Sequence, residues 1–243
     1  MQNRTGRKDL LKEIAEVINQ IDLPHPIRVA IDGAGNAGKT TFANELTESL
    51  ISLERDVIRS TIDGFHNPPE IRRRQGQYSP KGYFEDSYDY HSIKKYIIDP
   101  LGPNGNLEYK ESVYNFKINS PTNSEFKKVK RNSILIFDGI FLFNSHLFSY
   151  WDYKIYIDAS FDNTMQRAIA RDSELFGGEN EVIKLYKKRY IPGHEMYLSI
   201  YNPISISDIS INNNDFQNPI VTNISNNKHH SNLFHIRNSL IKR

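Results

Sequence analysis

Glycine occupies three positions of one short segment, which ends in a lysine and a threonine. The segment reads Gly33-Ala-Gly-Asn-Ala-Gly38-Lys39-Thr40 and matches the pattern G-x-x-x-x-G-K-[ST] at every position. Glycines let the backbone curl so that successive N–H groups point at one anion, and a helix that begins near Lys39 adds its positive end. We therefore predict a site for the phosphates of a nucleotide. Its expected members are Gly33, Ala34, Gly35, Asn36, Ala37, Gly38, Lys39, Thr40 and Thr41.

A carboxylate at the end of an apolar run is the second feature that could do chemistry. Asp138 directly follows residues 134–137, a run that is apolar on both faces and typical of a central parallel strand. We expect Thr40 and Asp138 to hold Mg²⁺ beside the phosphates of ATP. Gly139 stands where P-loop proteins that hydrolyse ATP commonly carry a glutamate. The sequence therefore favours transfer of the phosphoryl group to a hydroxyl over hydrolysis.

The elements that must position these residues alternate between strand and helix. A β-branched run over 27–32 predicts a strand before the glycines, and Phe42, Leu46 and Leu50 share one face of the helix expected after them. Further strands are expected over 56–62, 133–143, 153–157 and 204–211, and further helices over 10–21, 91–98, 162–171 and 181–190. This alternation predicts an α/β fold of the P-loop NTPase type, with a mostly parallel sheet and helices on both faces.

Three stretches lie outside that alternation. Residues 67–83 are polar, contain three prolines and predict a long loop. Partial alternation over about 107–126 predicts a β-hairpin excursion. Beyond Val221 the chain is polar and rich in asparagine. We therefore expect a single domain over 1–221, followed by a polar C-terminal tail over 222–243.

Composition excludes several classes of protein. The 243 residues include no cysteine, so thiolate zinc sites and disulfide scaffolds are excluded. Lysine and arginine number 31 against 29 acidic residues, an excess too small for a general nucleic-acid or membrane-surface partner. The most apolar window, residues 134–143, is broken by Asp138 and is shorter than the ~20 residues that cross a bilayer. Residues 1–26 mix charged and apolar positions, unlike a signal peptide. We expect a soluble cytoplasmic protein.

The segments around these motifs resemble the uridine kinase branch of the phosphoribulokinase/uridine kinase family, which also includes bacterial pantothenate kinases. The matching pieces, in the order of the family, are residues 31–46, 62–66, 86–89, 136–141, 167–172 and 189–193. The resemblance implies a kinase that uses ATP and Mg²⁺ and phosphorylates a small-molecule hydroxyl. The first expectation is the 5′-OH of uridine or cytidine, and pantothenate or another nucleoside or sugar stays open. A homo-oligomer is also open, because relatives are often oligomeric.

The resemblance also implies roles for three charged residues. Asp63 falls on the acidic residue that accepts the proton of the attacking hydroxyl. Arg167 and Arg171 stand four residues apart on a helix that leads into a lid over about 172–192, whose arginines neutralise charge on the transferred group. Gly177–Gly178 would be the hinge of this lid, and catalysis is assigned to Lys39, Asp63, Arg167 and Arg171.

The same resemblance implies which residues bind the phosphoryl acceptor. Uridine–cytidine kinases carry a Tyr-Asp-Phe-x-x-His pattern on the substrate hairpin, and this chain has Tyr114-Asn-Phe116-Lys-Ile-Asn119 there. The expected substrate-binding residues are His66, Tyr83, Tyr114, Phe116 and Asn119. Packing of the aromatic pair within the hairpin is the alternative interpretation. The run Arg72-Arg73-Arg74 either faces an anionic acceptor or is solvated, and the sequence favours solvation.

A P-loop switch or motor is the rival from another functional class. A guanine-specific switch should carry an N-K-x-D motif. The Asn-Lys pair of this chain, Asn227-Lys228, is followed by two histidines and lacks that aspartate. A motor should carry a second acid beside Asp138, where glycine stands instead. Both features favour the kinase.

Overall fold

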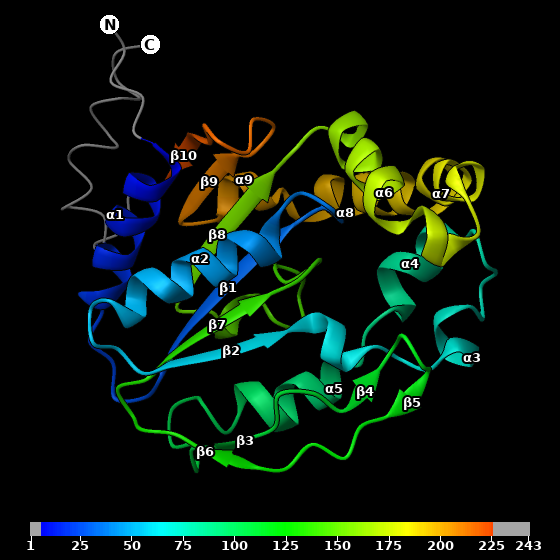
Figure 1. Ribbon diagram of the computed structural model, residues 1–243. Coiled ribbons are helices and arrows are strands. Elements are labelled where there is room, and N and C mark those ends of the chain that lie inside the picture. The colour runs from blue at the N-terminus through cyan, green and yellow to red at the C-terminus, as the bar shows by residue number, and fades with distance from the viewer. Residues whose placement is uncertain (1–5, 226–243) are drawn as a thin grey trace, which may run out of the picture.

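Six strands form one sheet in the computed structural model, which describes residues 6–225 (Figure 1). The strands are β1 (Ile27–Gly33), β2 (Val57–Thr61), β7 (Ile134–Asp138), β8 (Tyr153–Asp158), β9 (Ile209–Asn212) and β10 (Ile220–Ile224), in the order β10-β9-β8-β1-β7-β2. All neighbouring pairs are parallel except β9 and β10. The expected mostly parallel sheet is confirmed.

Helices cover both faces of this sheet. Alternate residues of β1 point to opposite sides, so Val29 packs in one buried cluster and Ala30 in another. The first cluster includes α1 (Arg7–Asn19) and α2 (Lys39–Ile51). The second includes α5 (Tyr90–Ile93), the π-helical turn η2 (Lys94–Ile98) and α8 (Ile191–Tyr201). The sequence prediction of an α/β fold with two helical layers is confirmed.

Residues 67–83 differ from the long loop that their prolines predict. They contain α3 (Pro69–Arg72) and the start of α4 (Pro80–Asp86), and a proline begins each helix. Proline fits the first turn of a helix because its missing N–H would lack a partner there anyway. Ser79 caps α4 by accepting the Gly82 N–H at 3.0 Å. Two of the three prolines therefore start helices instead of preventing them.

The C-terminal part also differs from its prediction. Residues 203–206 form the short helix α9 (Pro203–Ile206) and not a strand, because Asn202 adopts a left-handed conformation and Pro203 opens a new turn. β10 pairs with β9 as far as Ile224, so residues 222–224 continue the sheet. The rest of the expected tail, 226–243, lies outside the described residues.

The hairpin excursion consists of two short ladders. β3 (Glu108–Tyr109) pairs with β6 (Lys127–Lys128), and β4 (Tyr114–Asn115) pairs with β5 (Ser120–Pro121) between them. The Val113 N–H donates to the Gly64 carbonyl at 2.8 Å, which ties β4 to the 3-10 turn η1 (Ile62–Phe65) after β2. The excursion therefore lies beside the C-terminal end of β2.

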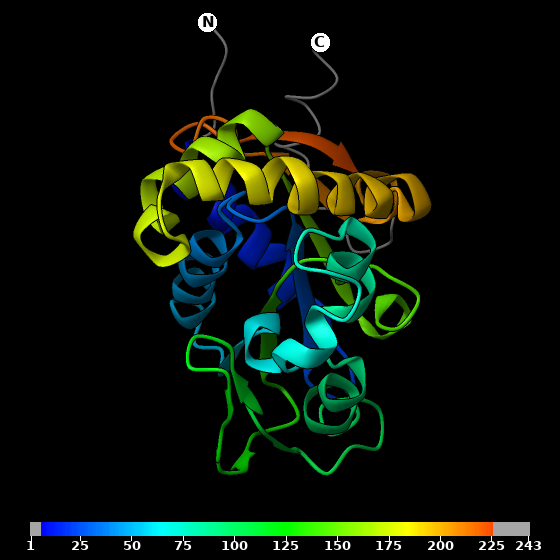
Figure 2. The ribbon, with the colours of Figure 1, turned by 90° about the vertical axis from the view of Figure 1, so that its right-hand side faces the viewer.

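The predicted lid segment, residues 172–192, is helical. α6 (Phe161–Phe176) ends at Gly177, whose φ of +85° is left-handed and favours glycine. After it, α7 (Glu179–Leu185), the π-helical turn η4 (Tyr186–Tyr190) and α8 follow one another as one long helical run (Figure 2). Within residues 6–225, no helix is long and apolar enough to span a bilayer.

Candidate active site

The glycine-rich segment 33–40 joins β1 to α2 and bends so tightly that two of its positions exclude side chains. A Cβ at Gly33 would lie 2.2 Å from the Ile157 carbonyl oxygen. Gly38 has a φ of +96°, and a Cβ there would lie 2.5 Å from Asn213 Nδ2. The same Nδ2 donates to the Ala37 carbonyl at 2.7 Å. Asn213, which sequence reasoning missed, therefore braces the loop from behind.

Lys39 is buried at the start of α2, and its ammonium donates to the Ala34 carbonyl at 2.6 Å. Burial lowers the pKa of Lys39, and the negative charges of Asp138, Asp32 and Asp63 oppose that shift. Three carboxylates on separate segments thus act on one ammonium group. Lys39 lies where the phosphate-binding motif requires its cation.

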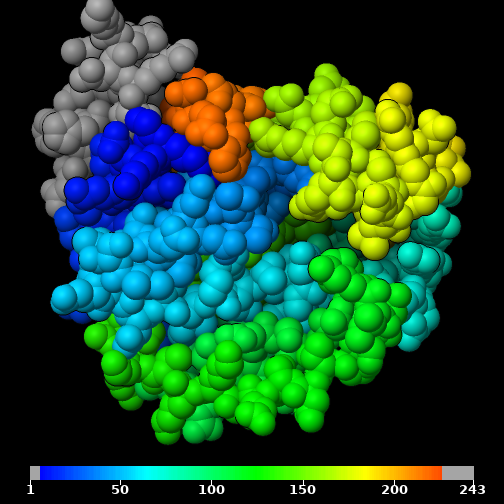
Figure 3. Space-filling model, in the orientation of Figure 1, coloured from blue at the N-terminus to red at the C-terminus, as the bar shows by residue number. Residues whose placement is uncertain are grey.

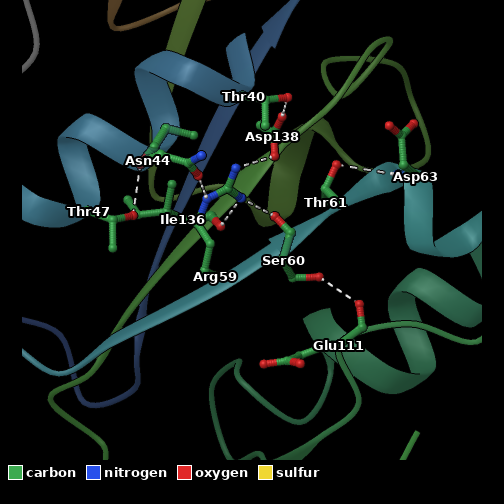
Figure 4. Close-up of polar contacts among 11 residues, drawn as sticks. Thr40, Asn44, Thr47, Arg59, Ser60, Thr61, Asp63, Glu111, Ile136 and Asp138 are labelled. Atoms are coloured by element: carbon green, nitrogen blue, oxygen red, sulfur yellow. Dashed lines mark hydrogen bonds and ion pairs between the residues drawn. The ribbon is translucent and has the colours of Figure 1, made fainter.

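Thr40 and Asp138 lie together, as the sequence predicts for a metal site (Figure 4). The Thr40 hydroxyl donates to Asp138 Oδ2 at 2.7 Å, and Arg59 on β2 donates to Asp138 Oδ1 at 2.7 Å. Asp138 is only 2% exposed. A hydroxyl and a carboxylate are hard oxygen donors of the kind that Mg²⁺ takes beside phosphates, so these residues fit that ion.

Arg59 is a site residue that sequence reasoning missed. Its Nε donates to Asn44 Oδ1 at 3.1 Å, and the parallel register places Arg59 opposite Ile136, two residues before Asp138. In the sequence, Arg59 could have been recognised as a charged residue within a predicted strand. Its guanidinium balances the buried charge of Asp138.

Asp63 lies on η1, directly after β2, and its side chain is exposed. Figure 4 shows its carboxylate pointing away from β2, at the edge of the sheet where Thr40 and Asp138 also lie. The charge of Asp63 acts on both Lys39 and Arg171. Asp63 therefore lies within electrostatic range of both the phosphate loop and α6. The space-filling view shows a recess on this face, among α2, β2 and the lid segment (Figure 3).

The two arginines of α6 have different surroundings. Arg167 donates to four backbone carbonyls, those of Asn36 and Ala37 at 3.4 Å and those of Asn213 and Asn214 at 2.8 and 3.0 Å. Its guanidinium is therefore occupied in holding the phosphate loop. The side chain of Arg171 is 70% exposed, and it forms two hydrogen bonds to Asp172 at 2.7 and 2.9 Å.

A buried polar cluster lies beneath the phosphate loop, and sequence reasoning missed it. Asp32 is completely buried and accepts the Tyr197 hydroxyl, the Gly33 N–H at 2.7 Å and the Phe143 N–H at 3.4 Å. Burial raises the pKa of Asp32 to about 6, although these donors oppose the shift. His194 lies nearby on α8, and burial lowers its pKa to about 3, so it stays neutral. The signal was an aspartate at the end of an apolar strand.

The candidate acceptor-binding residues fall into separate groups. The ring of His66 lies 4.6 Å from that of Tyr88 and 4.7 Å from that of Phe116, and its Nδ1 is 3.0 Å from the Asp63 carbonyl oxygen. His66 and Phe116 thus lie next to the proposed base. Tyr83 is buried instead, with its ring 5.1 Å from that of Phe141. It packs in the core and lies within electrostatic range of Asp63.

Tyr114 and Asn119 line a cavity of about 490 Å³ between α3 and the β4–β5 ladder. Pro68, Pro69, Glu70 and Pro121 form the rest of its lining. Tyr114 is 8% exposed, and its hydroxyl has no hydrogen-bond partner within the described part of the chain. A cavity of this size is typical of small-molecule sites.

Two curated proteins are similar to parts of this chain. A pantothenate kinase of Corynebacterium diphtheriae is 28% identical over 147 residues, which cover 58% of this chain and 47% of the relative. A uridine kinase of Saccharomyces cerevisiae is 30% identical over 156 residues, which cover 60% of this chain and 29% of the relative. The chain thus matches less than half the length of either relative.

The fold is also found in a solved structure described as a possible uridine kinase from Bacillus stearothermophilus. It superposes with a TM-score of 0.64 at 18% identity and covers 84% of this chain and 96% of its own. The sequence model of the phosphoribulokinase / uridine kinase family matches residues 28–204, well over half of the chain. This chain therefore belongs to the phosphoribulokinase/uridine kinase family.

Proposed function

We propose that this protein transfers the γ-phosphoryl group of ATP to a hydroxyl of a small molecule. The observation that carries the proposal is the position of Asp63, at the same edge of the sheet as Lys39 and the Thr40–Asp138 pair. In open α/β sheets, ligands bind at the carboxyl ends of the strands. The backbone N–H groups of 33–40 and the ammonium of Lys39 bind the triphosphate. Thr40 and Asp138 hold Mg²⁺, which neutralises charge on the phosphates when bound.

Asp63 acts as the base. Its carboxylate accepts the proton of the acceptor hydroxyl as that oxygen attacks the γ-phosphorus, and the bond from this phosphorus to the β–γ bridging oxygen breaks. ADP leaves, and the acceptor carries the phosphoryl group. A positioned base of this kind contributes ~10²–10⁴ in rate. The exposure of Asp63 leaves room for a hydroxyl to approach it.

Arg171 supplies positive charge to the transferred group when the lid segment closes. Its side chain is exposed, its partner Asp172 is adjacent in sequence, and it lies within the electrostatic range of Asp63. Closure also excludes water, which competes with the acceptor for the γ-phosphoryl group. The glycine beside Asp138 supports transfer over hydrolysis, because it leaves no second acid to activate water.

Two acceptor classes are supported by different observations. The resemblance of residues 114–119 to the hairpin of uridine–cytidine kinases supports the 5′-OH of uridine or cytidine, with Phe116 beside His66 as a stacking surface. The name of the Corynebacterium relative and the arginine of α3 support pantothenate or another hydroxy acid. We place the reaction in the cytoplasm, the compartment that a cysteine-free ATP-dependent enzyme suits. A homo-oligomer stays a prediction from the resemblance.

The test is ATP consumption measured with and without acceptors, with the phosphorylated product identified by mass. We expect turnover that depends on an acceptor and is abolished by Lys39→Ala. The matched control is Lys12→Ala, which changes an exposed lysine of α1 and should leave turnover unchanged. Equal turnover in the absence of any acceptor would contradict the proposed function.

A further inference from the structure

The three consecutive arginines 72–74 differ in their surroundings. Arg74 is 62% exposed and pairs with Asp86. Arg73 is exposed and lies at the end of α3. Arg72 is half-buried, and its carbonyl accepts a hydrogen bond from Arg189 at 3.2 Å, which fixes the backbone at this point. The sequence favours solvation for the whole run, and Arg72 is the one of the three that is only partly exposed.

Among the residues that the structure describes, none supplies a counter-charge to the guanidinium of Arg72. It donates to Asn119 Oδ1 at 2.6 Å, while its Nε is buried without a hydrogen-bond partner. Arg7, Arg28 and Arg59 each pair with a carboxylate, but within residues 6–225 no carboxylate forms an ion pair with Arg72. Burial lowers the pKa of Arg72, which reflects the cost of holding an unpaired cation there.

A second polar group nearby also lacks a partner. The hydroxyl of Tyr114 is buried and has no hydrogen-bond partner in the described part of the chain, and Tyr114 lies within electrostatic range of Arg72. Asn119, the partner of Arg72, lines the same cavity as Tyr114. A guanidinium, a phenol hydroxyl and an amide can all donate to one anion. Within residues 6–225 the Tyr114 hydroxyl and the Arg72 Nε have no hydrogen-bond partner, which indicates that these donors serve a ligand.

This group of donors lies beside the proposed base. The charge of Arg72 acts on His66, and His66 contacts the Asp63 carbonyl. The hydrogen bond between Val113 and Gly64 fixes the strand of Tyr114 against η1, which carries Asp63. The cavity of about 490 Å³ is lined by Tyr114 and Asn119, and Arg72 donates to Asn119. A small molecule in this cavity can therefore place one end near these donors and extend a hydroxyl towards Asp63.

We propose that the phosphoryl acceptor is a hydroxy acid, whose carboxylate binds Arg72, the Tyr114 hydroxyl and the Asn119 amide. The inference rests on the proposed kinase function and chooses among its acceptors. A carboxylate carries one negative charge, which one guanidinium balances. Glu70 also lines the cavity, and its negative charge would repel the second charge of a phosphate monoester. Uridine and cytidine offer no anion to these donors.

The test is a panel of acceptors arranged in pairs, and the two members of each pair differ mainly in charge. Pantothenate, D-glycerate and gluconate supply carboxylates, and panthenol, glycerol and glucitol are their neutral counterparts. Fructose 6-phosphate and fructose form the phosphate pair, and uridine is the nucleoside. We expect kcat/KM at least 100-fold higher for one of the hydroxy acids than for its neutral counterpart. Preference for fructose 6-phosphate, or for any neutral acceptor, overturns the inference.

Variants test which residues bind the carboxylate of the acceptor. Arg72→Gln should raise the KM for the hydroxy acid ~10- to 100-fold, because charge-assisted hydrogen bonds are lost. Its kcat and its KM for ATP should change less than threefold. Tyr114→Phe should raise the same KM and tests the site without changing a charge. The matched control Arg73→Gln removes an exposed neighbour and should have no effect. A KM within twofold of the parent protein in both Arg72→Gln and Tyr114→Phe overturns the assignment.

The outcomes separate this inference from the function on which it rests. Turnover of neutral acceptors alone leaves the kinase function standing and rejects the hydroxy-acid site. Failure to phosphorylate any of the hydroxy acids rejects the site as well. ATP consumption that no acceptor stimulates rejects the proposed kinase function itself.

Discussion

The hydroxyl of Thr40 donates a 2.7 Å hydrogen bond to Asp138 Oδ2, although the two residues are 98 positions apart in the chain. The sheet explains this proximity, because β1 and β7 are parallel neighbours in a register that pairs Ile31 with Asp138. The phosphate loop begins directly after β1, so its threonine returns to the end of β7. The expected pair of metal-binding residues is thus set by strand order.

The Thr40 hydroxyl should be needed for the metal and not for folding. We expect Thr40→Ala to raise the Mg²⁺ concentration for half-maximal activity about tenfold or more, because one hard oxygen donor is lost. Thr40→Ser keeps the hydroxyl and should retain most activity. Mg²⁺ titrations of initial rates provide the measurement. Thr47→Ala, on the same helix, should match the parent protein, and an unchanged Mg²⁺ dependence in Thr40→Ala would count against the metal assignment.

Asp63 should contribute to the chemical step and little to nucleotide binding. We expect Asp63→Asn to lower kcat ~10²–10⁴-fold, because an amide does not accept the hydroxyl proton. The affinity for ATP, measured by titration with a fluorescent analogue, should change less than threefold. Asp56→Asn is the matched control, since Asp56 is 56% exposed and pairs with Lys130 at the surface. A kcat for Asp63→Asn within threefold of the parent would remove Asp63 from the mechanism.

The two arginines of α6 should separate into a structural and a catalytic residue. Arg167→Ala removes hydrogen bonds to four backbone carbonyls, and we expect it to lower the free energy of unfolding by ~2–3 kcal/mol. Arg171→Ala loses an exposed pair of small energetic value and should unfold like the parent protein. Its kcat should nevertheless fall ~10³-fold, as for arginines that stabilise a transferred phosphoryl group. Denaturant unfolding and steady-state kinetics on both variants test this division, which the reverse pattern would contradict.

Asp32 should make stability depend on pH in an unusual direction. Its pKa is raised from 3.8 to about 6, so the folded protein binds this proton more tightly than the unfolded chain. The stabilising contribution is complete below about pH 4 and is lost as the pH rises through 6, amounting to ~3 kcal/mol. The stability difference between the parent protein and Asp32→Asn should therefore shift by most of that amount between pH 4 and 7.

Fluorescence of the single tryptophan, Trp151, follows the denaturant unfolding in this pH experiment. The control variant Asp22→Asn changes an exposed carboxylate, and its stability difference from the parent should stay constant with pH. A constant difference for Asp32→Asn as well would show that Asp32 ionises normally in the folded protein.

The sequence predicts the sheet and the phosphate loop well, because both depend on local patterns. The apolar run before Asp138 and the glycine spacing of 33–40 each lie within one segment, and each predicts its own element. The family resemblance is confirmed by the match over residues 28–204. The short helices α3 and α4 were missed because proline at a first helical position has the same local signature as a loop.

The surroundings of the site could not be predicted in the same way. Arg59 and Arg72 are ordinary charged residues in the sequence. Only the tertiary fold shows that Arg59 is paired with Asp138, while Arg72 has no carboxylate partner among residues 6–225. Tyr83 is expected beside the acceptor, and the structure adds that its buried ring packs against Phe141. Such roles depend on which strands become neighbours, and that information is absent from local spacing.

Asn213, which follows β9, connects the phosphate loop to the C-terminal part of the sheet. The Ala37 carbonyl receives a bond from Asn213, and Arg7 near the other end of the described chain donates to Asn213 Oδ1 at 3.0 Å. Asn213 thus joins α1 at the start of the domain to the phosphate loop. Almost the whole domain must therefore leave the ribosome before Asn213 can stabilise the phosphate loop. A nascent chain that ends before Asn213 lacks this hydrogen bond.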